Sequence, residues 1–145
     1  MKKAFQTYLK SIGFAKPLLQ RATVIMSFFE DQCGYRVEDI FVDEYLSEDG
    51  GRNYEAINFF TRDAILTAQN FTNEDDYSMW RPVSMEIHRM TITKKEYDFE
   101  EAIPASRLNI EVSIGLGGAE FKASGENCTH LWTIFKKYFL PLMQK

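Results

Sequence analysis

The segment Arg107–Leu116, RLNIEVSIGL, alternates apolar and non-apolar residues without interruption; its apolar positions are Leu108, Ile110, Val112, Ile114 and Leu116. Successive side chains of a strand point to opposite faces, so this period of two predicts a strand with one buried face. Glycines then predict a turn, and a second short alternation follows it at Ala119, Phe121 and Ala123. The stretch therefore predicts a half-buried antiparallel hairpin.

After Ser124 or Gly125 the period changes to that of a helix. Apolar residues recur at spacings of three and four: Cys128, Leu131, Trp132, Phe135, Tyr138, Phe139 and Leu142. Glu126 near the start and Lys136 and Lys137 near the end suit the helix dipole. We expect this amphipathic helix to pack on the sheet through Leu131, Trp132, Phe135 and Tyr138, with His130 on its polar side.

The other end of the chain predicts a helical hairpin over residues 1–34. The first helix has Phe5, Tyr8, Leu9 and Ile12 on one face and stops at Gly13. The second starts near Pro17, a residue suited to a first helical turn, and ends near Gly34. Its apolar face consists of Leu18, Ala22, Ile25, Met26 and Phe29.

Between these ends we predict further strands. The period of two begins at Val37, Asp49-Gly50-Gly51 predicts a turn, and the chain returns over residues 54–60 and 64–71. Residues 73–76 are expected to form a solvated loop. Val83, Met85 and Ile87 share a strand face, but Met90 is out of phase, which predicts a bulge near His88. We expect residues 94–106 to form a long loop, since they are charged and contain Pro104.

The predicted fold class is therefore α+β. An N-terminal helical hairpin (1–34) precedes a bent antiparallel sheet, or partly open barrel, of six or seven strands capped by the C-terminal helix (35–145). We expect one domain over residues 1–145, a length ample for a core.

This order of elements resembles that of a pleckstrin-homology-like (PH-like) domain, here similar to a bacterial version with an added helical hairpin. The resemblance covers residues 37–143 and rests on the order of elements. It implies that Trp132 acts as the buried aromatic plug of the terminal helix. The first hairpin turn, SEDGGR at 47–52, is net acidic and lacks the basic cluster with which phosphoinositide-binding members hold headgroups.

Composition narrows the function classes. A net charge of −4 argues against a nucleic-acid partner, which requires a basic face. No segment has the apolar length of a membrane span, and no signal peptide is evident. Cys33 and Cys128 form no disulfide framework, so we expect a cytoplasmic protein with reduced thiols. Aromatic residues make up 14% of the chain, which indicates a large core or an aromatic contact surface.

Motifs for chemistry are sparse. Glu86 and His88 would share a strand face and could perform acid–base chemistry, but no nucleophile stands near them in sequence. Two isolated histidines do not make a metal site. The glycines at 115, 117 and 118 lead into a strand rather than a helix, so they predict a hairpin and not a phosphate loop. We therefore expect no metal, cofactor or catalytic residue.

Two features bear on binding. Acidic residues recur at Glu38-Asp39, Asp43-Glu44, Glu48-Asp49, 74–76 and 96–101, and they could form one acidic face or merely lie in solvated loops and strand ends. The candidate partner site combines residue types enriched at interfaces: Tyr77, Met79, Trp80 and Arg81.

We expect a non-enzymatic protein-interaction module whose partner is a protein. A small acidic inhibitor or immunity-type protein that blocks a basic enzyme is the first alternative. A small enzyme using Glu86 and His88 is the second. The sequence does not determine the oligomeric state.

Overall fold

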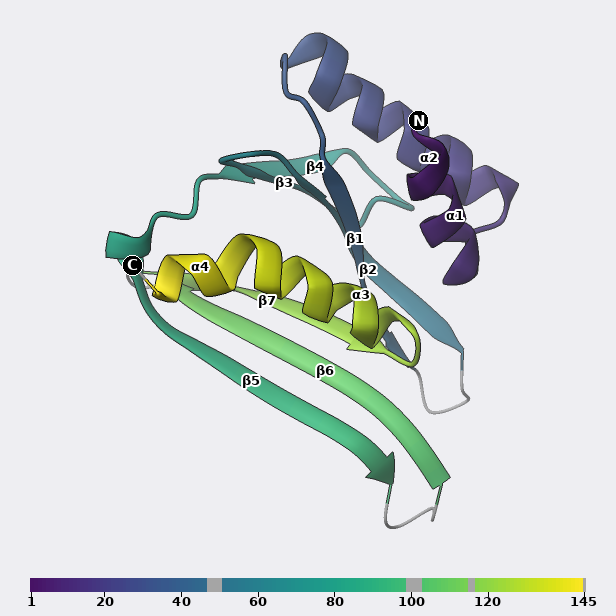
Figure 1. Cartoon of the computed structure of the whole chain (residues 1–145). Helices are drawn as coiled ribbons and strands as arrows, with labels where there is room; N and C mark the ends of the chain where they lie inside the picture. The colour runs from purple at the N-terminus through teal and green to yellow at the C-terminus, as the bar shows by residue number, and fades with distance from the viewer. Residues whose placement is uncertain (47–50, 99–102, 115–116, 145) are drawn as a thin grey trace. The chain divides into compact units, whose positions relative to one another are not determined.

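The computed structural model describes residues 1–46, 51–98, 103–114 and 117–144 of the chain (Figure 1). Their fold class is α+β, as the sequence predicts, with helices at both ends and antiparallel strands between them. The chain divides into two compact units. The first contains Met1–Val42 and Glu55–Arg81, and the second contains Asp43–Tyr54 and Pro82–Lys145. Whether the whole chain folds as one domain stays a prediction.

The first unit begins with the predicted helical hairpin, formed by α1 (Lys3–Ser11), α2 (Lys16–Ser27) and a π-helical turn (Phe28–Gln32). The predicted apolar faces are buried at Phe5, Leu9, Ile12, Ala22, Ile25, Met26 and Phe29, whereas Tyr8 and Leu18 are half-buried. Gly13 and Gly34 follow the two helical segments with positive φ angles of 99° and 77°, a conformation that glycine adopts without strain. The stop signals are therefore confirmed.

Four strands pair in the order β1-β2-β3-β4: β1 (Asp39–Leu46), β2 (Arg52–Phe60), β3 (Ile65–Gln69) and β4 (Asp76–Trp80). Phe29 of the helical segment packs on Phe59 of β2, with ring centroids 5.6 Å apart. The predicted break between β2 and β3 is confirmed. The Thr61 hydroxyl stabilises this turn, because it donates a hydrogen bond to the carbonyl of Ala64 and accepts one from the N–H of Ala64. Residue 76, expected in a loop, instead begins β4, which the sequence analysis missed because three of its five side chains are exposed and none is fully buried.

The second unit contains a sheet of order β5-β6-β7: β5 (Ile87–Asp98), β6 (Ile103–Ile114) and β7 (Gly117–Ser124). The decisive alternation forms β6, and Leu108, Ile110 and Val112 are buried as predicted. The bulge near His88 is confirmed by a register shift between Ile87 and Arg89. The long loop predicted over 94–106 is wrong, because most of it extends β5 and β6 into a long hairpin. Lys94, Lys95 and Glu96 occupy exposed strand positions, which polarity alone could not separate from a loop.

The C-terminal helix follows as α3 (Asn127–Ile134), a π-helical turn (Phe135–Phe139) and α4 (Leu140–Met143), and α3 packs on β6 and β7 (Figure 1). Its buried side chains are Asn127, Leu131, Ile134, Phe135 and Phe139. Trp132 is 39% exposed, so it is not the buried plug that the resemblance implies. The buried line runs through Leu131, Ile134 and Phe135, and Trp132 lies at its margin, stacked on Phe135. Tyr138 and Cys128 are half-buried.

Candidate functional site

The predicted partner segment forms β4, the last strand of its sheet, paired on one side with β3. Tyr77 lies opposite Ala68 and Met79 opposite Leu66, so both side chains occupy the same face. Trp80 belongs to the other face, and Arg81 follows the end of the strand. The structure thus brings these four residues to one sheet edge but gives them different environments.

The Tyr77 side chain packs against the helical hairpin and is not open to a partner. Its ring centroid lies 4.9 Å from that of Phe28 and 5.3 Å from that of Phe29, both in the π-helical turn after α2. Its hydroxyl donates a hydrogen bond to Oδ1 of Asp75 at 3.1 Å. Burial, followed by the neighbouring Asp75, raises the pKa of the phenol. Tyr77 therefore joins β4 to the helical hairpin.

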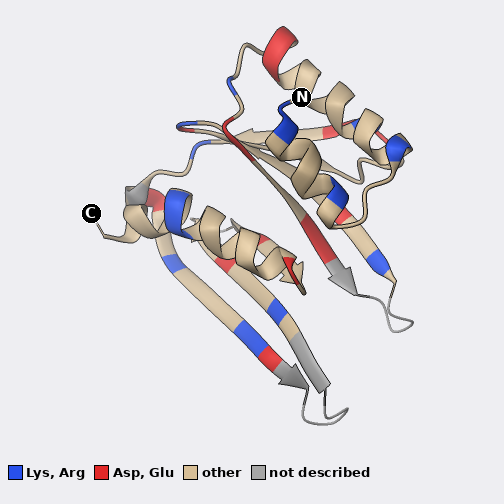
Figure 2. Ribbon diagram, turned by 45° about the vertical axis from the view of Figure 1, so that its right-hand side comes forward, with Lys and Arg blue, Asp and Glu red and all other residues tan. Residues whose placement is uncertain are grey.

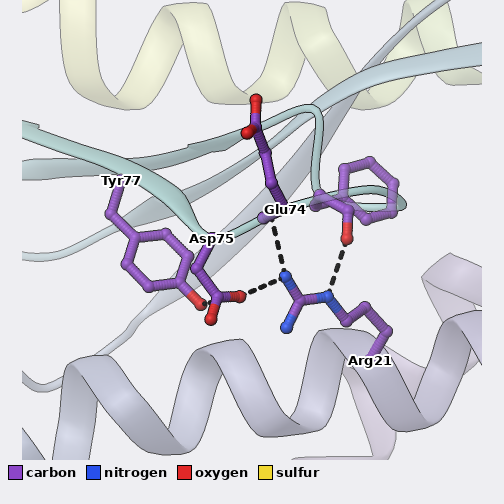
Figure 3. A network of polar contacts seen from close by, with 5 residues as sticks. Arg21, Glu74, Asp75 and Tyr77 are labelled. Carbon is purple, nitrogen blue, oxygen red and sulfur yellow. Dashed lines mark hydrogen bonds and ion pairs between the residues drawn. The ribbon is translucent and has the colours of Figure 1, made fainter.

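Arg21 of α2 holds the loop that leads into β4 (Figure 3). Its Nε donates to the carbonyl of Phe71 at 2.7 Å, and one terminal nitrogen donates to the carbonyl of Glu74 at 3.0 Å and to Oδ1 of Asp75 at 2.5 Å. The bond from Arg21 lowers the pKa of Asp75, and the same pair raises the pKa of Arg21. The start of β4 is therefore fixed by a planar, multiply bonded guanidinium.

Exposed side chains lie at the C-terminal end of β4. The Met79 side chain is 49% exposed, although methionine is apolar. Arg81 is exposed and forms an ion pair with Asp63 at 3.3 Å, and both side chains are largely open to solvent. Such exposed pairs contribute little stability. Trp80 is half-buried. Met79 and Arg81 are thus available for contact, while Tyr77 supports the strand.

The proposed acid–base pair is not assembled. Glu86 lies in a 3₁₀ turn (Ser84–Glu86), not in a strand, so the expectation that it shares a strand face with His88 is wrong. The expected strand positions Val83 and Met85 also fall outside strands, and both side chains are exposed. His88 is exposed at the bulge. His130, expected on the polar side of α3, is half-buried.

The glycines after β6 serve the hairpin. β7 begins at Gly117, which pairs with Ile114, while Gly115 lies outside the described residues. A Cβ atom at Gly118 would lie 2.6 Å from the carbonyl oxygen of Val112. The absence of a side chain at Gly118 is therefore required by the close approach of the two strands.

A second cluster was missed entirely. Asp43 and Glu44 were expected in solvated loops or strand ends, yet they are only 6% and 1% exposed. Asp43 accepts a hydrogen bond from the backbone N–H of Lys122. Glu44 forms an ion pair with Arg52, whose Nε lies 3.8 Å from Oε2. Burial raises the pKa of Glu44, and the charge of Arg52 and the amide of Asn127 partly oppose that rise.

Glu44 lines a cleft of about 300 Å³ in the second unit. The other principal polar side chains of the cleft come from β5, β6 and β7: Thr93, Lys95, Arg107, Asn109 and Lys122. Lys95 pairs in register with Arg107, and Asn109 with both Thr93 and Lys122, so these side chains share one face of the sheet. Figure 2 shows the basic positions along β5 and β6. Lys95, Arg107 and Lys122 therefore lie on the face of the sheet that lines this cleft.

A further cleft of about 330 Å³ lies by α3 in the same unit. Ile92, Leu108, Cys128 and Trp132 give it an apolar lining. The Cys128 thiol bonds the carbonyl of Ala123 at 3.4 Å, and burial, followed by the charge of Glu44, raises its pKa. Cys128 is thus not an activated nucleophile.

Within the described part of the chain, no group of three or more His, Cys, Asp or Glu side chains is arranged so that it could hold a metal ion. None of the helices described there has the length and apolar character that crossing a membrane requires.

The chain was compared with protein families, curated proteins and solved structures. No protein-family model and no curated protein matches the chain. The crystal structure of the C-terminal domain of an unknown protein from Leishmania infantum matches with 16% sequence identity and a TM-score of 0.47. That match covers 81% of this chain and 96% of the other.

Proposed function

We propose that this protein is a non-enzymatic protein-interaction module whose partner docks along β4. The observation that carries the proposal is the contrast within that strand. Tyr77 is packed on Phe28 and Phe29, whereas Met79, on the same face two residues later, is 49% exposed. A strand that exposes an apolar side chain, with an exposed arginine just after its end, has the composition of a contact site.

Strand β4 also supplies a mode of binding. It stands at the end of the order β1-β2-β3-β4, and among the described strands it pairs with β3 alone. An extended segment of a partner protein can add to such an edge through main-chain hydrogen bonds. The Arg21 network and Tyr77 hold β4 in place before the partner arrives, which lowers the entropic cost of binding.

The inhibitor alternative has less support. Two of the carboxylates named for an acidic face, Asp43 and Glu44, are buried, and Asp75 is exposed but bonded to Arg21. Among the described residues of that set, the exposed carboxylates that remain are Glu38, Glu74, Asp76 and Glu96. The PH-like relationship remains part of the proposal and rests on the order of elements: helices, seven described strands and a terminal helix.

The proposal is tested by capturing partners from a lysate of the encoding organism with three forms of the chain. Met79→Lys places a charge at the displayed end of β4. Val24→Lys is the matched control, since Val24 is 60% exposed on α2 of the same unit. We expect Met79→Lys to reduce capture of the same protein at least about tenfold, and Val24→Lys to leave it unchanged.

Circular dichroism and urea melts of both variants establish that each is folded. Equal capture by the wild type and Met79→Lys would contradict the proposal that the partner docks along β4. Repeating the capture at high salt separates the inhibitor alternative, because exposed charge pairs are screened while apolar and main-chain contacts persist.

A further inference from the structure

The apolar cleft beside α3 contains two large apolar side chains that solvent reaches. Ile92 of β5 is 43% exposed and Trp132 of α3 is 39% exposed, and both line this cleft of about 330 Å³. Leu108 of β6 also lines it and is buried. A concave site with an apolar lining is the usual form of a small-molecule site, and the proposed interaction role along β4 leaves this one unused.

The arrangement of the elements explains why this cleft is open to solvent. The helix α3 packs on β6 and β7, whereas β5 stands at the end of the sheet order β5-β6-β7 (Figure 1). Ile92 pairs in register with Ile110, and Lys94 pairs with Leu108, so these four side chains share one face of the sheet. The two β6 residues on this face are buried, but Ile92 beside them is not.

The direction of α3 places Trp132 at the Ile92 end of the cleft. Just before the helix, the N–H of Gly125 donates to the carbonyl of Ser106 at 2.8 Å. Early in the helix, the Cys128 thiol donates to the carbonyl of residue 123, which pairs with residue 108 of β6. The helix therefore passes beside β6 in the direction of residue 110, which is the partner of Ile92.

The opposite end of the cleft is charged. Among the described residues, Lys94, Lys95, Glu96 and Arg107 line it there, so positive charge exceeds negative charge. Lys94 shares the face of Ile92, and its Nζ lies 2.8 Å from Oε1 of Glu96. Both side chains of this ion pair are largely exposed, and such pairs contribute little stability. Lys94 can therefore exchange Glu96 for the carboxylate of a ligand at small cost.

We propose that this cleft binds the anion of a medium-chain fatty acid. The alkyl chain lies between Ile92 and Trp132 and against Leu108, where binding removes exposed apolar surface from water. The carboxylate pairs with Lys94 at the charged end. The stretch of β5 from residue 92 to residue 96 spans about 13 Å, which is close to the extended length of decanoate. This inference does not rest on the proposed protein partner.

Calorimetric titration of the full chain with sodium decanoate tests the proposal, with acetate and decyltrimethylammonium as separate arms. Acetate has the charge without the chain, and decyltrimethylammonium has the chain with the opposite charge. Decanoate should bind with a Kd below about 1 mM and at least about tenfold more tightly than either of them. The net charge of −4 favours the cation elsewhere on the surface, so a preference for decanoate has to come from the cleft. Equal affinity for either comparison compound, or no binding of decanoate at about 5 mM, would overturn the proposal.

Variants locate the alkyl chain. Ile92→Asp places a carboxylate where the chain lies and should weaken decanoate binding at least about tenfold. Val83→Asp is the matched control, because Val83 is also β-branched, is 41% exposed and belongs to the same unit, but does not line the cleft. Equal weakening by both variants would contradict the proposal. If Ile92→Asp does not fold, Trp132→Ala provides the same test, and unchanged affinity in that variant would overturn the position of the chain.

A second pair of variants locates the carboxylate. Lys94→Met keeps most of the side-chain length but removes the charge, so it should weaken decanoate binding and reduce the preference for decanoate over decyltrimethylammonium. Lys136→Met is the control, since Lys136 is exposed on the C-terminal helical segment and does not line the cleft. Unchanged decanoate affinity in Lys94→Met, or an equal loss in Lys136→Met, would overturn the pairing of the carboxylate with Lys94.

Discussion

The backbone N–H of Lys122 donates a hydrogen bond to Oδ1 of Asp43 at 2.9 Å, although the two residues lie 79 positions apart. This bond joins the outer part of β1 to β7 within the second unit. Asp43 is 6% exposed, so its carboxylate has been largely removed from water. A buried carboxylate that accepts a charge-assisted hydrogen bond from a backbone N–H stabilises the fold more than an exposed ion pair does.

Asp43→Ala should therefore lower the free energy of unfolding by about 1–3 kcal/mol, because the Lys122 amide is left unpaired. Asp63→Ala is the control, since Asp63 is exposed and paired only with exposed Arg81, and it should change stability by less than about 0.5 kcal/mol. Urea melts of both variants measure the difference. Losses of equal size would mean that the Asp43 bond contributes nothing beyond an exposed contact.

Glu44 should make stability depend on pH. Its folded-state pKa is raised above the ordinary value of 4.5, so the folded chain holds this proton more tightly than the unfolded chain does. The associated stability is fully present below the ordinary value and is lost as pH rises through the raised folded pKa. Glu44→Gln cannot ionise, and it should gain stability relative to the wild type as pH increases.

Urea melts of the wild type and Glu44→Gln between about pH 4 and pH 8 measure this difference, in which the contributions of all other groups cancel. A stability difference that stays constant over that range, or that shrinks at higher pH, would contradict a raised pKa at Glu44.

Helical spacing places both Phe135 and Trp132 on the apolar face of the helix, but Phe135 should contribute more to stability than Trp132 does. Phe135 is 3% exposed, and Phe135→Ala should destabilise the protein by about 3–5 kcal/mol through loss of apolar contacts and formation of a cavity. Trp132→Ala should cost less than about 2 kcal/mol, because this side chain is 39% exposed. Thermal or urea unfolding ranks the two variants, and a larger loss for Trp132→Ala would place the tryptophan in the core.

Arg21 should matter more than the carboxylate with which it pairs. Arg21→Met removes the hydrogen bonds to the carbonyls of Phe71 and Glu74 as well as the bond to Asp75, and should cost about 1–3 kcal/mol. Asp75→Asn leaves both carbonyl bonds in place and should cost less. The two urea midpoints test the order, and a greater loss for Asp75→Asn would mean that the ion pair, not the carbonyl bonds, holds the loop.

The local pattern of apolar and polar residues predicted much of the secondary structure. The alternation at 108–114, the helical spacing of Ala22, Ile25, Met26 and Phe29, and the phase slip at His88 each correspond to an element or irregularity that is present. These features depend on neighbours within a few residues, and the period of side-chain direction is a property of the backbone itself. The helix ends at Gly13 and Gly34 could be predicted for the same reason.

Strands with exposed side chains were harder to recognise. Asp76–Trp80 and residues 94–96 have strand geometry, but three of the five side chains of Asp76–Trp80 and those of Lys94, Lys95 and Glu96 are exposed. A polar residue on an exposed strand face has the same local sequence signature as one in a loop. The sequence could therefore identify Tyr77, Met79, Trp80 and Arg81 as a group, but not which of them is displayed.

By itself, the sequence determined the α+β class, the helices at the two ends and the half-buried faces of several elements, because periodicity is local. Only the tertiary structure decided which polar residues are buried. Asp43 and Glu44 read as solvated charges until β7 supplies Lys122 and the start of α3 supplies Asn127, more than 70 residues away. Burial depends on what the rest of the chain places around a side chain, and a short stretch of sequence does not contain that information.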